Sequence, residues 1–559
     1  MQIVLVSLTL LLVVALSGVV LRLLPVKLPL PLVQIALGAI LAMPPLSLHV
    51  RFDHEVFFLL FIPPLLFADG WRIPKREFFL LRTPILTLAL GLVFGTVAGL
   101  GYFVHWMIPT VPLAVAFALA SVLSPTDAVA VSSITGGASL PSRLLHLLEG
   151  EALMNDASGL VSLQFSVAAA LTGAFSLRDA SFKFVLVAVG GLAVGFATTW
   201  VFSRVRRRLV RWSGDIDPPS QVALLLLLPF AAYLLAEDLL HVSGILAAVA
   251  AGMTIKYTDI LKGGQAALRI QNNTVWNMLQ FVFNGIIFLL LGLQLPEIVG
   301  QAPEVLNEAG GGSLWMLLGY VLAISVLLVL MRFVWIWCSL KVARLIARLR
   351  GRKSEPASTR MIWVTALAGV RGAISLAGVL SLPVVMMDGS PFPTRSLMIF
   401  LATGVILCTL LIGSIGLPKL LKNIELPEDP HAREEHFGRS RASAAAIKAV
   451  ERWLAERPQS QGELYDSVAS RVGSRVVSDY QQRIAAMAEE DDDASDVGEA
   501  RLEVALEREL RMTALRAERE EVARLNRAHM INDTTLRMLA REIDIDEAAV
   551  DSLQAKGGH

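Results

Sequence analysis

The sequence predicts an all-α polytopic membrane protein with about 13 transmembrane helices and a helical cytoplasmic tail. Its 559 residues are 55% hydrophobic and their mean hydropathy is +0.61, which is too apolar for a soluble protein. Long apolar runs fill the first three-quarters of the chain, whereas the part after Pro427 is rich in Glu, Asp and Arg. We therefore expect a transmembrane domain at 1–425 and a tail at 426–559.

The apolar runs approach the roughly 20 residues that a helix needs to cross the hydrocarbon of a bilayer. The first run, Met1–Leu24, lacks the basic start of a signal peptide, so we expect it to remain as the first helix. The predicted spans are 2–22, 28–45, 54–69, 79–103, 111–133, 146–173, 182–204, 219–236, 241–255, 274–297, 314–338, 361–386 and 396–418.

Cationic residues between the spans predict the orientation. With the N-terminus on the periplasmic side, basic clusters such as Arg204–Arg211 and Lys341–Arg360 fall in the cytoplasm. The opposite loops carry few cations, among them Arg51, Arg178, Lys183 and Arg395. This asymmetry predicts an odd number of helices and a cytoplasmic C-terminus.

Composition also argues against several kinds of partner. The two cysteines, Cys338 and Cys408, lie in apolar segments and have neither metal-binding spacing nor a disulfide pattern. No basic stripe with interleaved aromatic residues occurs, so nucleic acid is not expected as a partner. We expect no cofactor.

The tail is predicted to be helical. Leu426–Pro430 contains two helix-breaking prolines and marks a linker. Amphipathic helices are expected at about 439–457, 461–489 and 498–530, with a short helix at 536–543. The acidic run Glu489–Asp493 is interpreted as a solvated loop. The charged helix faces suit either solvated surface or a regulatory or dimer-stabilising role.

The predicted span 111–133 is interrupted by Ser124-Pro125-Thr126-Asp127. Proline removes a backbone donor and breaks the helix, and a broken helix survives in lipid only beside protein or a water-filled cavity. Thr126 adds a hydroxyl and Asp127 adds a carboxylate at this break, which favours ion binding over an incidental proline kink.

The predicted span 146–173 carries a second polar group in an apolar setting. Glu151, Asn155 and Ser158 are spaced to share one helix face, and Asp156 is adjacent to them. Oxygen ligands of this kind suit a hard cation such as Na⁺. Burial disfavours a charged carboxylate, so a proton can compete with the cation for the same site and produce exchange. Glu149 is interpreted as an interfacial group.

The predicted span 361–386 carries a cation, Arg371, between Gly369 and Gly372. The two glycines mark a second break, and two interrupted helices are typical of inverted-repeat transporters. A buried arginine needs a counter-charge, for which Glu151 is the first choice. The alternative is an arginine that reaches the interface.

Other functions are compatible with two buried aspartates. An intramembrane aspartyl protease would use Asp127 and Asp156 as a dyad that shares one proton, but the Gly-x-Gly-Asp context is missing. A channel or sensor gated by the tail is a third class, and it predicts conductance without saturable counter-transport.

Three motifs together resemble the monovalent cation:proton antiporter-1 family, which includes bacterial sodium/proton antiporters and animal sodium/proton exchangers. They are Ser-Pro-Thr-Asp127-Ala-Val, Glu-Gly-Glu151-Ala-Leu-Met-Asn155-Asp156-Ala-Ser-Gly and Gly-Val-Arg371-Gly-Ala. Tyr233-Leu-Leu-Ala-Glu237, His241-Val-Ser-Gly and Phe283-Asn-Gly-Ile-Ile-Phe also agree. The similarity covers roughly residues 10–420.

The resemblance implies a homodimer in the lipid bilayer of a bacterial inner membrane, with an ion-binding core that moves against a dimerisation domain. It implies pH homeostasis by exchange of Na⁺, or Li⁺, for H⁺ at Asp156, with Asp127, Thr126 and Asn155 around the ion. It further implies a structural Glu151–Arg371 pair. Exchange should be electroneutral because Asn155 replaces a second aspartate found in electrogenic relatives. K⁺/H⁺ or mixed exchange is the alternative, and Ala152 stands where some relatives have a serine.

Overall fold

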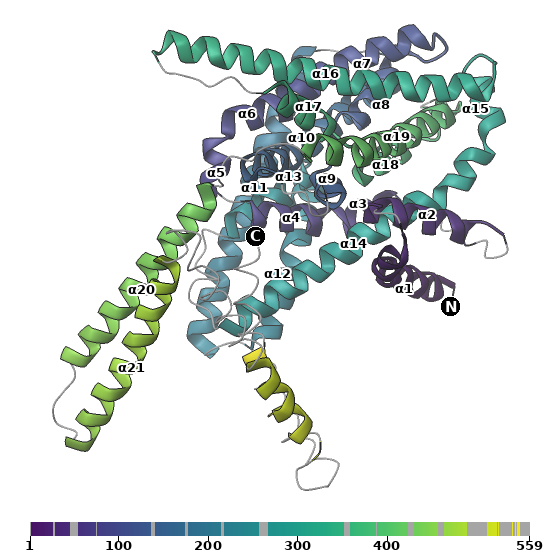
Figure 1. The fold of residues 1–559 in the computed structure, drawn as a ribbon. Helices are drawn as coiled ribbons and strands as arrows, with labels where there is room; N and C mark the ends of the chain where they lie inside the picture. Colours follow the sequence, from purple (N-terminus) through teal and green to yellow (C-terminus); the bar gives the residue numbers. More distant parts are fainter. Residues whose placement is uncertain are drawn as a thin grey trace. The chain divides into compact units, whose positions relative to one another are not determined.

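The fold is helical throughout the part of the chain that the computed structural model describes (Figure 1). The described residues are 2–25, 28–44, 48, 54–73, 75–135, 140–173, 177–213, 217–255, 266–351, 358–386, 388–422, 430–456, 463–488, 511–522, 524, 539, 543 and 545–547. The chain forms two compact units, Met1–Leu426 and Pro427–His559. Within these residues every regular element is a helix, which confirms the predicted all-α class.

The helices of the first unit follow in chain order. They are α1 (Gln2–Leu23), α2 (Leu30–Ala42), α3 (His54–Leu60), α4 (Ile62–Arg72), α5 (Lys75–Leu80), α6 (Arg82–Leu86), the π-helix η1 (Thr87–Leu92), α7 (Val93–Met107), α8 (Leu113–Leu123), α9 (Ala128–Thr135), α10 (Ser142–Thr172), α11 (Leu177–Ser213), α12 (Pro218–Leu234), the π-helix η2 (Leu235–Leu239), α13 (Gly244–Ile255), α14 (Ala266–Gly300), α15 (Ala302–Glu308), α16 (Leu314–Leu349), α17 (Thr359–Leu367), α18 (Ala373–Leu380) and α19 (Arg395–Leu421).

Seven helices in the described residues are long and apolar enough to cross a membrane, and the bent pair α8 and α9 makes an eighth. Several predicted spans instead divide into shorter helices. The span at 54–69 becomes α3 and α4, because two prolines at the start of α4 begin a new helix there. The span at 361–386 becomes α17 and α18. A total of 13 crossings therefore remains a prediction.

One bundle of the first unit contains α1, α2, α4 and α11 to α14, which pack closely on one another. Glycines allow these helices to approach backbone to backbone. A Cβ at any of four glycines would overlap a carbonyl of the neighbouring helix: Gly38, Gly292, Gly252 and Gly195. Small residues of this kind hold helices together in lipid, where no hydrophobic effect drives them to associate.

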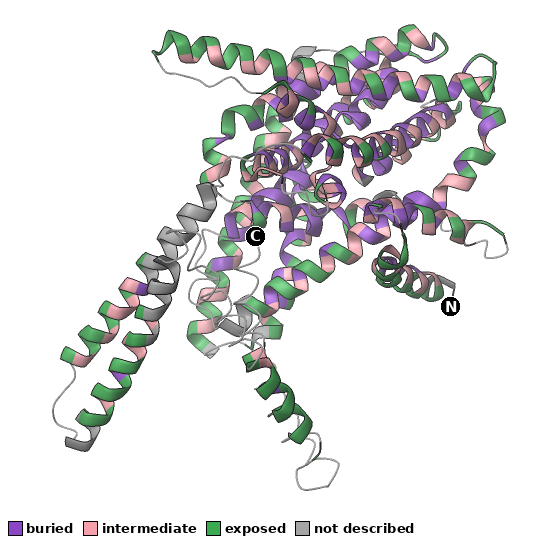
Figure 2. Cartoon of the chain, in the orientation of Figure 1, coloured by how far each residue is buried: buried purple, intermediate pink, exposed green. Residues whose placement is uncertain are grey.

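A second bundle contains α7 to α10 and α16 to α19. Its core consists of apolar side chains such as Leu119, Val364 and Leu397, which are fully buried. Contacts between the two bundles are sparse compared with those inside each. Buried residues gather where helices meet, whereas α1 and α11 expose apolar side chains such as Leu8 and Phe196 (Figure 2). These outward faces suit contact with lipid.

The second unit contains α20 (Pro430–Glu456) and α21 (Glu463–Ala488), which pack together with Gly473 against Leu454. They fall on the first two helices predicted for the tail. Residues 511–522 are helical and lie within the predicted 498–530 segment. Of the predicted linker Leu426–Pro430, residues 426–429 fall outside the described residues and Pro430 begins α20. The acidic run Glu489–Asp493 and most of 536–543 also fall outside them.

Candidate ion-binding site

Two broken helices meet in the second bundle, as the sequence predicted. α8 and α9 bend by 47° at the Ser124–Asp127 break, and α17 and α18 are separated by 368–372. The Asp127 N–H donates to the Val370 carbonyl over 2.9 Å, which joins one break to the other. Gly372 is required at this crossing because a Cβ there would overlap the Asp127 carboxylate. Each break thus supplies a partner for the backbone of the other.

Asp127 caps the helix that follows the first break. Its Oδ1 accepts hydrogen bonds from the N–H groups of Val129 (2.8 Å) and Ala130 (3.0 Å), in the first turn of α9. A carboxylate at this end also offsets the positive pole of the helix dipole. One oxygen of Asp127 is therefore committed to the backbone, and its second oxygen faces Gly372.

α10 brings Asp156 to the same crossing. Gly159, one turn further along, lies against the Pro125 ring, where a Cβ would overlap the ring. Ser158 donates to the Ala89 carbonyl of η1 over 2.7 Å and so fixes the helix on its other side. The Asp-Ala-Ser-Gly sequence therefore positions the aspartate by close packing against the proline break.

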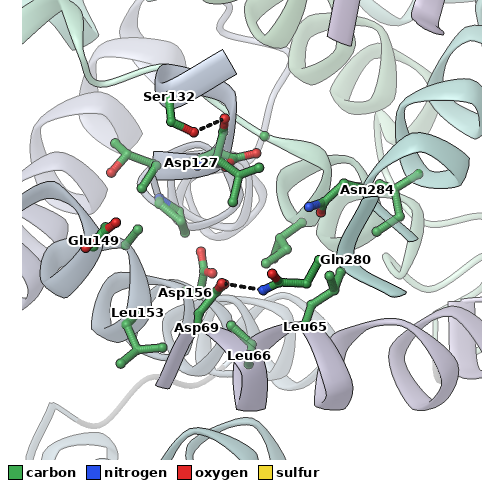
Figure 3. A pocket seen from close by; sticks show the side chains of 18 of the residues that line it. Leu65, Leu66, Asp69, Asp127, Ser132, Glu149, Leu153, Asp156, Gln280 and Asn284 are labelled. Atoms are coloured by element: carbon green, nitrogen blue, oxygen red, sulfur yellow. Dashed lines mark hydrogen bonds between the residues drawn. The ribbon is translucent and has the colours of Figure 1, made fainter. Parts of the chain in front are cut away.

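A cavity of about 370 Å³ lies between the bundles and is lined by Asp127, Asp156 and Thr126. Figure 3 shows the Asp156 carboxylate pointing into this cavity from α10. The side chain is 8% exposed, and Thr126 is 6% exposed. The predicted association of these three residues is therefore present in the geometry. In the described structure no hydrogen bond joins Asp127 to Asp156, and Asp127 Oδ1 instead accepts from the backbone of α9.

The cavity contains a third aspartate that the sequence interpretation missed. Asp69 of α4 lies beside Asp156 and accepts a hydrogen bond from Gln280 of α14 over 3.0 Å (Figure 3). Asn284 of α14 adds another amide to the lining. Asp127 and Asp69 are near enough for their charges to act on Asp156. The sequence did contain a signal for this site, because Asp69 directly follows the apolar run Ile62–Ala68.

Glu151 is held by Arg332 rather than by Arg371, which corrects the predicted ion pair. Arg332 of α16 binds both oxygens of Glu151, with Nη2 to Oε2 at 2.7 Å, and its Nε donates to the Thr365 carbonyl over 2.9 Å. The two side chains are 2% and 1% exposed. Gly369 leaves room for the arginine, because a Cβ there would lie 2.6 Å from its Cδ.

Arg371 has a different role at the second break. Its Nη1 donates to the Gly369 carbonyl over 2.5 Å, and its backbone N–H donates to Thr409 over 3.3 Å. The side chain is buried at 3% exposure, so it does not reach the interface. A cation beside the C-terminal end of α17 offsets the negative pole of that helix. Asp127 and Arg371 thus place opposite charges at opposite helix ends of the crossing.

Asn155 lies next to Thr126. Its Nδ2 donates to Thr126 Oγ1 over 2.9 Å, and Thr126 in turn donates to Glu151 over 3.4 Å. Asn155 does not line the cavity. The Nδ2 group therefore fixes the threonine. The buried Oδ1 of Asn155 has no hydrogen-bond partner in the described structure, and its predicted role as an ion ligand stays a prediction. Ala152 and Glu149 do line the cavity, and Glu149 is 38% exposed, in agreement with an interfacial position.

Residues 8–423 match the family described as sodium/hydrogen exchanger, transmembrane. The chain belongs to this sodium/hydrogen exchanger family. It is 46% identical over 541 residues to an uncharacterized Na⁺/H⁺ exchanger, YjcE, of Escherichia coli K12, covering 96% of this chain and 97% of that protein. It is also 45% identical over 428 residues to a sodium, potassium, lithium and rubidium/H⁺ antiporter of Bacillus subtilis 168, covering 75% of this chain and 62% of the relative.

The fold of this exchanger-family chain is similar to a solved structure. The sodium/proton antiporter MjNhaP1 of Methanocaldococcus jannaschii at pH 8 superposes with a TM-score of 0.56, covering 76% of this chain and 99% of that one. At 16% identity this likeness concerns the fold alone. Family membership confirms the resemblance inferred from the motifs. The protein is a multi-pass membrane antiporter for monovalent cations and protons, and it is not an enzyme.

Proposed function

We propose that this antiporter exchanges Na⁺, or Li⁺, for H⁺ across a bacterial inner membrane, and that both ions bind at Asp156. The observation that carries the proposal is a buried carboxylate that opens into a cavity containing two further aspartates, beside two crossed helix breaks. Family membership supports the reaction class but leaves the ion and the residues open. In this role the protein would contribute to pH homeostasis.

The exchange follows from competition at one carboxylate. A desolvated carboxylate gains free energy by binding either a proton or a cation, and one bound ion excludes the other. The cation would be held by Asp156, the free oxygen of Asp127 and the Thr126 hydroxyl, which are all hard oxygen ligands. Asn155 and the Glu151–Arg332 pair would hold Thr126 in place.

Alternating access would come from movement of the two bundles against each other. Close glycine contacts join the helices of the first bundle to one another. Contacts between the two bundles are sparse, and the cavity lies between the bundles. Asp156 belongs to the second bundle and Asp69 to the first, so such movement would separate them. We further propose a homodimer, a periplasmic N-terminus and a cytoplasmic C-terminus, as the cationic loops favour.

Electroneutral one-for-one exchange is the stoichiometry that we propose. α10 presents two carboxylates to the cavity, Glu149 and Asp156, and of the two Asp156 lies beside the crossing. Its neighbour Asn155 carries no charge. A second candidate is exchange of a broader set of cations that includes K⁺. The relative from Bacillus subtilis is named for sodium, potassium, lithium and rubidium, which favours testing all four ions.

Asp156→Asn tests the site. The purified chain in liposomes should lose cation-dependent proton flux with Na⁺, Li⁺, K⁺ and Rb⁺, because an amide can neither exchange a proton nor neutralise a cation. Asp388→Asn is the matched control, since Asp388 is exposed in the loop between α18 and α19. Exchange that survives in Asp156→Asn would refute the site assignment. A wild-type flux that responds to a clamped membrane potential would refute electroneutrality.

A further inference from the structure

α16 is too long for the bilayer that it crosses. Its 36 residues extend for about 54 Å, whereas the hydrocarbon core is about 30 Å thick. Two exposed tryptophans mark the expected boundaries: Trp315 is 80% exposed and Trp337 is 40% exposed. They are 22 positions apart, which corresponds to about 33 Å along a helix. Tryptophans favour the two interfaces, so the helix beyond Trp337 continues past the hydrocarbon.

The continuing segment, Lys341–Arg350, is an overhang with two distinct faces. Val342, Leu345, Ile346 and Leu349 project within an arc of about 100°. Their exposed fractions are 55%, 58%, 44% and 80%, so the described protein does not cover them. An apolar face of this kind requires a covering partner.

Cations line the adjacent face of the overhang. Lys341, Arg344 and Arg348 fall within an arc of about 60° that borders the apolar arc. In the described residues none of the three forms an ion pair, and Leu314–Gly351 contains no Asp or Glu. Lys341 lies over the Trp337 ring, with its Nζ 3.6 Å from the ring centroid, at the boundary itself.

α11 repeats this design in the other bundle. Arg204 lies over Trp200, also four residues earlier, at 4.2 Å from the ring centroid. Arg207, Arg208 and Arg211 follow, and Trp212 is 93% exposed. Both long helices thus end in a tryptophan–cation pair and then a basic segment.

We propose that the overhang Lys341–Arg350 of α16 binds anionic phospholipid. A phospholipid supplies both complements at once: its phosphate meets the cationic arc, and its acyl chains cover the apolar arc. A soluble acidic partner would satisfy the cations alone. Because α16 belongs to the bundle that contains Asp156, a lipid bound to the overhang would attach one end of that bundle to the membrane surface.

Photo-crosslinking gives a local test. The full chain, with a benzophenone amino acid replacing Leu345, is reconstituted in equimolar phosphatidylglycerol and phosphatidylcholine, and the cross-linked lipids are identified by mass spectrometry. We expect phosphatidylglycerol to dominate. Each cation near an anionic surface changes lipid affinity roughly fivefold. K341Q, R344Q and R348Q together should therefore lower the phosphatidylglycerol-to-phosphatidylcholine ratio by at least about tenfold.

The control removes the same charge elsewhere. K448Q, R452Q and R471Q change three exposed cations of α20 and α21 and should leave the ratio unchanged. If the α16 triple variant does not fold, the labelled protein with all its cations is measured at high salt instead. Salt screens the charges and should lower its phosphatidylglycerol-to-phosphatidylcholine ratio. An unchanged ratio in the variant or in salt, or cross-links to protein instead of lipid, would overturn the assignment. Neither readout depends on exchange activity.

Discussion

Removing Arg332 should destabilise the protein strongly, because it leaves the Glu151 carboxylate buried without its counter-charge. The pair makes two charge-assisted hydrogen bonds, and Arg332 makes a third to the Thr365 carbonyl. Exposures of 2% and 1% leave little room for water to replace the guanidinium. The remaining partner of Glu151 in the described structure is Thr126, at 3.4 Å.

The magnitude follows from this isolation. Breaking a buried ion pair by removing one member costs about 3–5 kcal/mol, whereas replacing both members by apolar residues costs much less. R332M should therefore lower the free energy of unfolding by about 3–5 kcal/mol. E151M together with R332M should be less destabilising than the sum of the single variants, with a coupling energy of at least about 2 kcal/mol.

Unfolding of the purified chain in mixed micelles, followed by circular dichroism, measures these free energies. R371M provides the matched comparison, since Arg371 is equally buried but donates to Gly369 instead of Glu151. Its coupling with E151M should be smaller than that of R332M, because Arg371 makes no hydrogen bond to Glu151 in the described structure. A larger coupling of Glu151 with Arg371 than with Arg332 would refute the assignment and restore the pair predicted from the sequence.

Three further predictions concern the cavity. G372A should reduce exchange at least about tenfold because a Cβ would displace the Asp127 carboxylate, whereas G319A, with nothing within 4 Å of its Cβ position, should not; equal rates for the two would contradict the crossing geometry. D69N should raise the KM for the cation roughly tenfold, which corresponds to about 1.4 kcal/mol, and should change kcat little, because it removes one negative charge near the ion. An unchanged KM would show that the Asp69 charge does not act on the ion. Competition at Asp156 predicts that each pH unit of acidification, once the carboxylate is mostly protonated, raises the cation KM about tenfold; a change in kcat alone would argue against a shared site.

The sequence predicted the crossing because its signals are local. A proline between a serine and a threonine, and an arginine between two glycines, break apolar helices wherever those helices lie. Asp156 was predicted for a similar reason, since a carboxylate in an apolar run must face a cavity or a counter-charge. These inferences required no knowledge of which helices are neighbours.

The partners of these residues could not be predicted in the same way. Arg332 and Glu151 are 181 positions apart, and no periodicity relates α16 to α10. Arg332 is itself a lone cation in an apolar run, so the argument that identified the aspartates applied to it equally. Choosing between Arg332 and Arg371 required the packing of α16 against α17, where Gly369 opens space for one guanidinium. Asp69 was missed because it ends its apolar run instead of interrupting it.

The position of Asn155 changes the reasoning behind electroneutral exchange. If Asn155 faced the ion, its missing charge would lower the charge of the site directly. It instead holds Thr126, and the cavity contains Asp69 as well as Asp156. The charge moved per cycle therefore depends on which of these carboxylates exchanges a proton for the cation. Asp69 lies on α4, in the bundle joined to α13 by Gly252, whereas Asp156 and Asp127 lie in the other bundle.

In the proposed cycle Asp127 would travel with Asp156, and its Oδ1 accepts hydrogen bonds from the first turn of α9, which favours the charged form of this carboxylate. Its charge would then move with the bundle in both the proton-loaded and the cation-loaded states and would cancel over a full cycle. In the proposed cycle only Asp156 would change its bound ion. One proton would then replace one monovalent cation, and we expect that wild-type flux does not respond to the clamped potential. If wild-type flux responded to the clamped potential and D127N removed that response, Asp127 would itself be exchanging protons and this account of the stoichiometry would be wrong.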